Sequence, residues 1–272
     1  ILHKFYTSTS VSVGKLDRTL KIWNYESEEL DLDQTFQDDL YGVDLHPSGL
    51  YAIVGFSDKL RFLTIMIEEF ETTREFNIRV CKQCVFSKLG HMFAAANGNV
   101  IQVYSSVNFE MMYNLKGHNG KINGISWTND DRKMASCGSE GAIYEWGVSD
   151  QKRLSEVVMK QCEFTGVAIT TDGRSIYVVA NDGHIREFMN ANINRDVLLT
   201  PSGLDSMVLS KLDQMLFVSG NAGSIYNVKL PLLEKAEYQE YSVHGDTVTH
   251  VSKIVTNIYT VIVFLDVDCF RR

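Results

Sequence analysis

The chain has 272 residues, of which 44% are hydrophobic and 22% are charged, and its formal net charge is −8. This apolar content is enough for a large buried core. An acidic chain without a cluster of lysines and arginines is a poor match for a nucleic-acid or anionic-membrane surface, although it remains compatible with basic protein partners.

The cysteines and the apolar runs indicate in which cellular compartment the protein is expected. Five cysteines, an odd number, and the lack of an Asn-x-Ser/Thr sequon indicate a reducing, intracellular environment. The chain begins with Ile1 instead of Met, so we expect that its true amino terminus can lie upstream. The apolar run 254–265 is interrupted by Thr256, Asn257 and Thr260 and is shorter than a bilayer span of about 20 residues. We therefore expect no membrane anchor.

The clearest motif lies in residues 115–146. It starts with Gly117-His118 and continues as three short apolar segments that are joined by turns too short for a crossover helix. Such segments predict an antiparallel meander. The segments are Ile122–Trp127, Met134–Cys137 and Ala142–Trp146.

The motif recurs along the chain at a nearly constant spacing. Copies end on bulky apolar residues at positions 23 and 188, and weaker copies end at positions 63, 104 and 228; with Trp146 the spacings are 40, 41, 42, 42 and 40 residues. A period of about 40–45 residues is typical of repeats that each supply one four-stranded propeller blade. The sequence thus predicts an all-β propeller of six recognisable blades plus an irregular seventh, either complete or incomplete, with almost no helix.

The first two blades are expected as follows. Residues 9–13 supply a strand that leads into a turn at Asp17, and no Gly-His strand precedes it, so the first blade begins incomplete. Either the ring closes with strands from both ends of the chain, or the chain is cut from a longer protein. Residues 30–33 form an exposed outer strand. Blade two follows with strands at 41–45, 51–55, 59–67 and 69–76.

The remaining blades repeat the same turn chemistry in the same places. In blade three, Asn97-Gly98 follows the strand 92–96 and is a favoured hairpin turn, because both residues tolerate positive φ. A seventh repeat starts at 243–251, after which no Asp-Gly turn with a following aromatic residue occurs. We expect residues 1–251 to form the propeller and residues 252–272 to form a divergent C-terminal tail or an irregular closing strand.

We expect one set of residues to have a structural role in the blades and no catalytic or binding role. These residues end the third strand of a blade, lie in the preceding turn, or form a hydrogen-bonded network in blade four. They are Asp17, Trp23, Asp58, Leu63, Tyr104, His118, Ser136, Glu140, Trp146, Asp182, Phe188 and Val228.

The blade-four network resembles the staple of a WD-repeat blade, in which a His, a strand Ser or Thr, a turn Asp and a Trp are linked. Here Ser136 and Glu140 are the candidates for the middle positions between His118 and Trp146. Glu140 stands where the pattern has Asp, so we expect a strained network or none. A catalytic Ser/His/acid set is the alternative, and it is disfavoured because no sharp nucleophile turn or oxyanion donors are recognisable.

No other combination of residues indicates a catalytic, cofactor or metal site. Cys81 and Cys84 have the spacing of half a zinc site, but no second pair exists, and residues i and i+3 of a strand point to opposite faces. The carboxylate pairs 38–39, 68–69 and 130–131 are interpreted as solvated turns. We therefore expect no cofactor and no metal.

Several strings carry a resemblance that goes beyond the repeat. They are Arg18-Thr19-Leu20-Lys21-Ile22-Trp23-Asn24-Tyr25-Glu26, Leu45-His46-Pro47-Ser48-Gly49, Val54-Gly55-Phe56-Ser57-Asp58-Lys59-Leu60-Arg61, Ala94-Ala95-Ala96-Asn97-Gly98-Asn99-Val100-Ile101, Leu115-Lys116-Gly117-His118 and Gly141-Ala142-Ile143-Tyr144-Glu145-Trp146. Together, over about residues 11–251, the chain resembles the second propeller of a family of cilia- and flagella-associated WD-repeat proteins.

This resemblance implies a function and partners. In that family two propellers precede a long coiled coil, and the protein is an axonemal adaptor for inner dynein arms and the nexin-dynein regulatory complex on doublet microtubules. The resemblance implies a scaffold located in the axoneme of cilia or flagella. A general cytosolic WD-repeat adaptor in another complex is the alternative.

A propeller enzyme is a further alternative, and it would require polar residues that converge at the central channel. The segments that we expect to be inner strands carry small apolar residues instead: Ala52-Ile53-Val54, Ala94-Ala95-Ala96 and Val178-Val179-Ala180. This composition favours a scaffold, whose variable turns would carry a protein-binding face.

Overall fold

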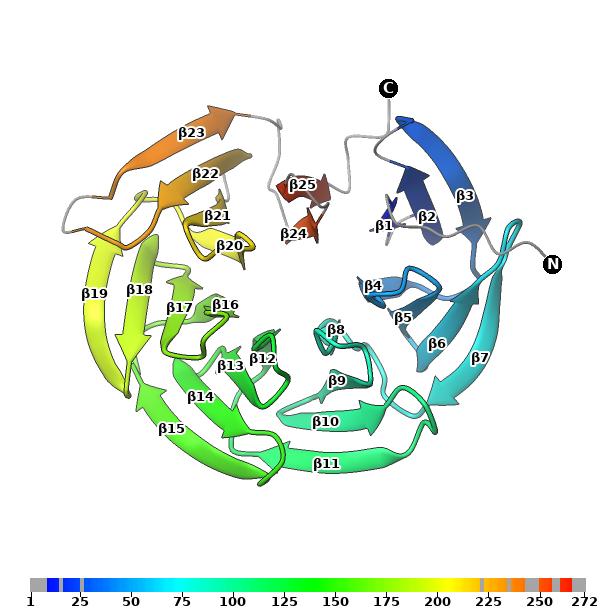
Figure 1. Ribbon diagram of the computed structural model, residues 1–272, viewed down its shortest axis with the longest axis horizontal. Helices are drawn as coiled ribbons and strands as arrows, with labels where there is room; N and C mark the ends of the chain where they lie inside the picture. Colours follow the sequence, from blue (N-terminus) through cyan, green and yellow to red (C-terminus); the bar gives the residue numbers. More distant parts are fainter. Residues whose placement is uncertain are drawn as a thin grey trace. The chain divides into compact units, whose positions relative to one another are not determined.

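The computed structural model describes residues 9–14, 17–24, 27–220, 223–233, 236–242, 250–255 and 260–265 (Figure 1). Every regular element in these residues is a β-strand, which confirms the all-β class. No helix of the described residues is long and apolar enough to cross a membrane. By its internal contacts the chain divides into two compact units, residues 1–116 and 117–272.

The first unit contains three antiparallel sheets, which correspond to blades one to three. Blade one has three strands in the described residues, and blades two and three have four each. The strands are β1 (Thr9–Gly14), β2 (Thr19–Asn24) and β3 (Glu29–Thr35); β4 (Leu40–Leu45), β5 (Tyr51–Phe56), β6 (Leu60–Ile65) and β7 (Phe70–Phe76); and β8 (Cys84–Phe86), β9 (Met92–Asn97), β10 (Val100–Ser105) and β11 (Met111–Lys116).

The second unit contains three four-stranded sheets, which are blades four to six, and one pair of strands. The strands are β12 (Ile122–Trp127), β13 (Lys133–Gly138), β14 (Ala142–Gly147) and β15 (Lys152–Val158); β16 (Phe164–Ile169), β17 (Ser175–Ala180), β18 (His184–Met189) and β19 (Asn192–Leu198); β20 (Leu204–Leu209), β21 (Met215–Gly220), β22 (Ser224–Lys229) and β23 (Tyr238–Ser242); and β24 (His250–Val255) with β25 (Thr260–Leu265).

The third strands show why the repeat has a fixed register. The aligned apolar residues 63, 104, 146, 188 and 228 lie near the end of the third strand of their sheet, and Trp23 lies near the end of β2, the middle strand of the three-stranded blade one. In blades one to five, the pairing of this strand with the next one shifts by a β-bulge directly before the aligned residue. A bulge bends the strand and increases its twist. The recurrent apolar residue therefore marks the same bend in five successive blades.

The cores of both units lie between consecutive sheets. Between blades two and three, Phe62, Phe76, Phe86, Phe93 and Tyr104 form an aromatic cluster in which most rings meet edge to face. Phe93 and Tyr104 are stacked, with centroids 5.3 Å apart. Such pairs add to the apolar burial that holds neighbouring blades together.

The segments that we expected to be inner strands are the second strands of their sheets. Ala52–Val54, Ala94–Ala96 and Val178–Ala180 belong to β5, β9 and β17, whereas the first strands β4, β8, β12, β16 and β20 contact one another from blade to blade within each unit. The expectation was wrong because the small residues serve packing between sheets. Their composition therefore says nothing about the innermost strand.

The innermost strands do carry polar side chains, and these bind the backbone of the next blade. The Asn123 amide donates to the Phe164 carbonyl at 2.8 Å, and the Thr165 hydroxyl donates to the Leu204 carbonyl at 2.6 Å. In the first unit the Phe86 N–H donates to the Asp44 carboxylate at 2.6 Å. These polar residues link consecutive first strands, which accounts for their place in the innermost strand.

The last pair of strands differs from the expected single strand. β24 and β25 pair with each other in antiparallel fashion, and β24 contacts β20 of blade six. Both segments are rich in β-branched residues, which favour strands. β24 runs across position 251, our expected end of the propeller, and this boundary stays an expectation. Most of the predicted seventh repeat, 243–249, and the end of the tail, 266–272, lie outside the described residues.

Candidate functional site

Blade four holds its strands together with a buried hydrogen-bonded staple. The Nε2 atom of His118 lies 2.7 Å from the Ser136 hydroxyl, and its Nδ1 atom lies 2.5 Å from Glu140 Oε1. The Trp146 indole N–H donates to the same Ser136 hydroxyl at 2.8 Å. The structure thus brings all four residues together, and the network that we expected to be strained or absent is formed.

The staple has the composition of a Ser/His/acid triad, but its geometry prevents catalysis by Ser136. The Ser136 side chain is fully buried, and Trp146 is only 2% exposed. Burial lowers the pKa of His118, although Glu140 opposes this shift. Because a carboxylate can only accept, a neutral His118 carries its proton on Nδ1 and accepts from Ser136 through Nε2. The hydroxyl is thereby occupied on both sides and out of reach of a substrate.

Two glycines explain why glutamate fits where the pattern has aspartate. A Cβ atom on Gly138 would lie 2.2 Å from Glu140 Oε2, and one on Gly120 would lie 2.6 Å from the same atom. Real Cβ atoms essentially never come so close to another atom, so a side chain at either position would displace the Glu140 carboxylate. The longer glutamate side chain therefore occupies the space that Gly120 and Gly138 leave open, and from there it contacts His118.

The other blades keep only parts of this arrangement. In blade one, the Trp23 indole N–H donates to the Ser12 hydroxyl at 2.8 Å, which matches the link between Trp146 and Ser136. The corresponding residues of the remaining blades have no indole and pack in the core; they are Leu63, Tyr104, Phe188 and Val228. Blade four therefore has the most complete staple in the part of the chain that the structure describes.

The acidic turn residues act locally in their own blades. Asp17 accepts from the Thr19 N–H at 3.3 Å, and Asp182 accepts from the His184 N–H at 3.0 Å. Asp58 and Asp182 also bind the arginine of the following strand, Arg61 at 3.0 Å and Arg186 at 2.6 Å. These carboxylates thus bind turn N–H groups and arginines, whereas the acidic residue of the blade-four staple binds a histidine.

A second repeated feature was missed in the sequence. Two positions before each aligned apolar residue, a polar residue of the same strand lies directly opposite a polar residue of the next strand. Cross-strand neighbours of this kind stabilise a sheet. The six residues could have been found by reading this position in each repeat. The pairs are Lys21–Asp33, Arg61–Glu75, Gln102–Asn114, Tyr144–Glu156, Arg186–Asp196 and Tyr226–Glu240.

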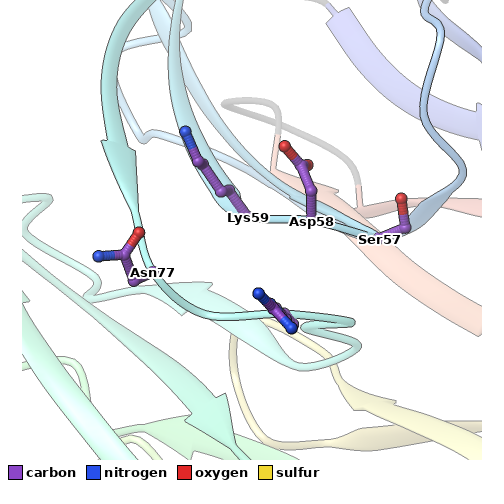
Figure 2. A pocket seen from close by; sticks show the side chains of 5 residues that line it. Ser57, Asp58, Lys59 and Asn77 are labelled. Carbon is purple, nitrogen blue, oxygen red and sulfur yellow. The ribbon is translucent and has the colours of Figure 1, made fainter.

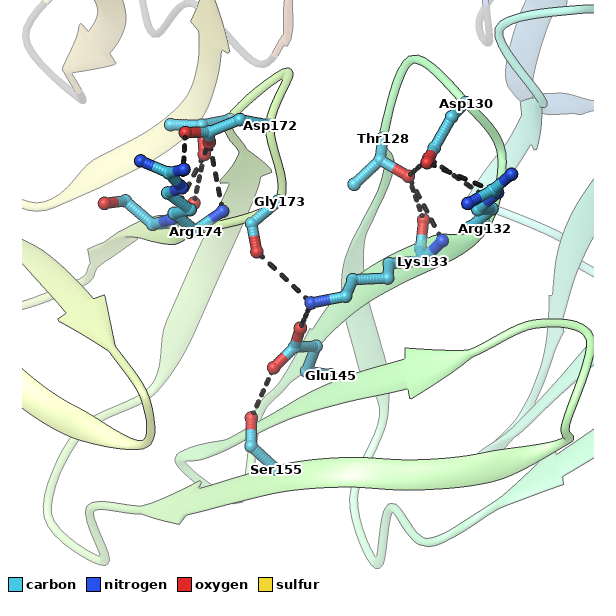
Figure 3. Close-up of polar contacts among 11 residues, drawn as sticks. Thr128, Asp130, Arg132, Lys133, Glu145, Ser155, Asp172, Gly173 and Arg174 are labelled. Atoms are coloured by element: carbon cyan, nitrogen blue, oxygen red, sulfur yellow. Dashed lines mark hydrogen bonds and ion pairs between the residues drawn. The ribbon is translucent and has the colours of Figure 1, made fainter.

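The turns between the first two strands of blades four and five are built alike (Figure 3). The Thr128 hydroxyl donates to Asp130 at 2.7 Å, and 42 residues later the Thr170 hydroxyl donates to Asp172 at 2.6 Å. The Lys133 ammonium binds Glu145 at 2.8 Å and reaches the Gly173 carbonyl at 3.5 Å. This lysine therefore links blade four to the turn of blade five.

Two of the three expected solvated carboxylate pairs are in fact engaged. Asp131 is only 4% exposed and has a left-handed backbone φ of 56° in its turn. In blade two, Asp38 binds Arg61 and Asp39 binds Arg18, both at 2.9 Å. The arginine partners of Asp38 and Asp39 cannot be predicted from the carboxylate pair itself, because they lie about 20 residues away in the sequence.

Arg61 is the centre of an ion network at one end of blade two. Its guanidinium contacts Asp38 at 2.9 Å, Asp58 at 3.0 Å and Glu75 at 3.3 Å, while its Cζ atom lies 4.2 Å from the centre of the Phe56 ring. The Arg61 side chain is only 15% exposed. In blade two this ion network connects strands and turns, as the buried staple does in blade four.

An open pocket of about 420 Å³ lies beside this network (Figure 2). Ser57, Asp58 and Lys59 of the turn between β5 and β6 line it together with Asn77 and Arg79 of the loop between β7 and β8. Antiparallel pairing brings this turn and this loop to the same end of the blade. The volume is in the range of small-ligand sites.

The loop that carries Asn77 and Arg79 is anchored on both sides of Arg79. Ile78 is 1% exposed and belongs to the aromatic core, and the Val80 N–H donates to the Phe56 carbonyl at 3.1 Å. Val80 has a φ of 50°, which is rare for a β-branched residue and costs about 1–3 kcal/mol. After this turn, β8 begins at Cys84.

The two cysteines of this region lie close together in the core. Cys81 precedes β8 and is fully buried, and Cys84 is 3% exposed. A hydrogen bond to Cys81, together with burial, raises the pKa of Cys84. The expectation that the two side chains point to opposite faces was wrong, because Cys81 is not in the strand. No group of three metal-ligating side chains occurs among the described residues.

Comparison with known proteins agrees with this geometry. The family model described as "WD domain, G-beta repeat" matches residues 109–147, which contain the complete staple of blade four. The chain is a WD-repeat β-propeller. This match covers one repeat, and the WD-repeat fold of the other blades follows from their sheets, spacing and bulges.

The WD-repeat propeller is also similar to longer curated proteins. It is 40% identical over 238 residues to cilia- and flagella-associated protein 57 of Mus musculus, and 29% identical over 280 residues to cilia- and flagella-associated protein 57 C of Tetrahymena thermophila. These matches cover 88% and 91% of the chain. The chain spans about a fifth of the length of these two relatives, namely 19% and 21%.

Proposed function

We propose that this propeller is a non-enzymatic protein-interaction module of the ciliary or flagellar axoneme. In this role it helps to assemble or anchor inner dynein arms and the nexin-dynein regulatory complex on doublet microtubules. The observation that carries the proposal is the 40% identity over 88% of the chain to a protein named for its association with cilia and flagella. The dynein and nexin partners rest on the family resemblance of the sequence strings.

The site geometry supports a binding role over a catalytic one. Ser136 and His118 of the Ser/His/acid set in blade four are buried, and they are already hydrogen-bonded to Trp146 and Glu140. The polar residues of the first strands are bound to the backbone of the next blade. Rigid blades of this kind present their turns as a binding surface. A stable interface buries at least about 1,000 Å² in total, so we expect turns of neighbouring blades to be covered together.

Localisation in ciliated cells tests this proposal. The full gene product that carries this chain and the 272-residue propeller are tagged separately and located by microscopy, and axonemes are then extracted with salt. We expect the full product in the axoneme, where it resists extraction. A full product that stays in the cell body contradicts the proposal, and the alternative of a cytosolic adaptor in another complex becomes the better account.

A further inference from the structure

The pocket at the charged end of blade two contains one cation, Arg79, that its neighbours do not neutralise. Arg18 is paired with Asp39, Arg61 with three carboxylates, and Lys59 with Glu75. Arg79, in contrast, makes no ion pair or side-chain hydrogen bond with any residue of the described part of the chain. Its guanidinium thus has five N–H donors to offer to a ligand.

Arg79 belongs to an acidic part of the sequence. Residues 28–39 and 68–79 contain ten carboxylates and two arginines, a net charge of −8, which equals the net charge of the whole chain. The loop sets the backbone position of Arg79, because Ile78 is buried, the Val80 N–H is hydrogen-bonded to Phe56 and the backbone turns left-handed at Val80.

We propose that the pocket formed by Ser57, Lys59, Asn77 and Arg79 binds the carboxylate side chain of an aspartate or glutamate in a partner protein. This inference rests on the proposed role as an interaction module and names the chemistry of one contact. A carboxylate accepts two parallel hydrogen bonds from a guanidinium, and such charge-assisted pairs are strong and directional. The Asn77 amide and the Ser57 hydroxyl supply further donors at the pocket wall.

The charge count favours one carboxylate over a phosphate group. Asp58 lines the same pocket, and Lys59 is already paired with Glu75, so one positive charge remains unmatched. A single negative charge balances it, whereas a phosphate monoester carries close to two at neutral pH. The pocket is open to the surface, so an aspartate or glutamate side chain of a partner has access to it.

The test is a titration of the full 272-residue chain with isotope-labelled arginine, followed by NMR at the guanidinium Nε–H groups. The probes are amide-capped N-acetylglutamate, the matching glutamine compound and inorganic phosphate. We expect the Arg79 signal to shift and saturate with the glutamate probe, and binding to be at least about tenfold weaker with the glutamine probe or in the Arg79→Ala variant. Arg74 is the matched control, because it is also exposed and unpaired but lies outside the pocket.

Three results would overturn the inference: equal shifts with the glutamate and glutamine probes, tighter binding of phosphate, or equal shifts of Arg74 and Arg79. Thermal melting of Arg79→Ala shows whether the variant is folded, and Asn77→Ala provides a second variant of the pocket. Because the titration needs no cilium, the pocket can fail this test while the axonemal location holds. Conversely, the axonemal proposal can fail while the pocket proposal holds, since a pocket can bind carboxylate in a protein that never enters cilia.

Discussion

Blade four and blade two use different polar contacts to connect the strands of their sheets. In blade four, buried hydrogen bonds connect His118 and Trp146 to the same Ser136 hydroxyl across the sheet. In blade two, Leu63 takes the place of the tryptophan, and the polar contacts have moved outward to the partly exposed ion network of Arg61. Repeats that share a register therefore need not share the interactions that hold them.

The difference bears on function. In blade four every polar group of the staple except Glu140 Oε2 has a partner, and Ser136 and Trp146 are buried. In blade two the network lies beside a pocket and leaves Arg79 without a partner among the described residues. We infer that blade four mainly supports the fold, whereas the charged end of blade two is where contact with a partner is expected.

Truncation of Trp146 is the most severe test of the comparison. Trp146→Ala removes a buried indole and leaves a cavity, so we expect a loss of about 3–5 kcal/mol in the free energy of unfolding. Chemical denaturation measures this loss, and Trp146→Phe, which keeps most of the packing, should cost less. If Trp146→Ala unfolds at the same denaturant concentration as the wild type, blade four does not carry the stability assigned to it.

Loss of Arg61 should cost less, because its carboxylate partners are partly solvated. Arg61→Ala removes the contact with the Phe56 ring and leaves three carboxylates close together. Since exposed ion pairs contribute little, we expect a loss of about 1–2 kcal/mol that becomes smaller at high salt. Arg74→Ala is the control and should be near neutral. A loss as large as that of Trp146→Ala would erase the distinction between the two blades.

The two blades should respond to pH with opposite signs. Burial raises the pKa of Asp44 in blade two to about 6, so between about pH 4 and 6 this group makes the folded state less stable as pH rises. His118 in blade four has a lowered pKa, so its contribution is full above its ordinary value of 6.5 and is lost as pH falls below it. The Asp44→Asn variant should therefore lose stability more steeply on acidification than the wild type. Unfolding curves from pH 7 to 4 check this, and parallel pH profiles would contradict it.

The smallest expected effect concerns the length of the staple's carboxylate. Glu140→Asp withdraws the carboxylate from His118 Nδ1 by one methylene, while Gly120 and Gly138 leave the vacated space empty. We expect a loss of about 0.5–1.5 kcal/mol, the usual net value of one hydrogen bond. Chemical denaturation at neutral pH measures it. A gain in stability would mean that aspartate reaches the histidine equally well and that the two glycines serve another purpose.

The sequence predicted the local features and missed those that depend on contact between distant segments. The 40–42-residue spacing of bulky residues correctly indicated the propeller, because each blade is a local meander. It could not show that Gly120 and Gly138 make room for Glu140, since this space exists only after three strands have come together. The pocket of Arg79 was missed for the same reason, because a turn and a loop about 20 residues apart form it.

The most direct test of the account is site-specific photo-crosslinking in axonemes. A photoreactive phenylalanine analogue replaces Asn77, beside the pocket, or Arg132, whose side chain is 82% exposed in a turn of blade four, in the full gene product. We predict cross-links to axonemal proteins from position 77 that disappear when Arg79→Glu is added. A full product that resides in the axoneme and cross-links only from position 132, or equally well with Arg79→Glu, would contradict the assignment of partner contact to the charged end of blade two.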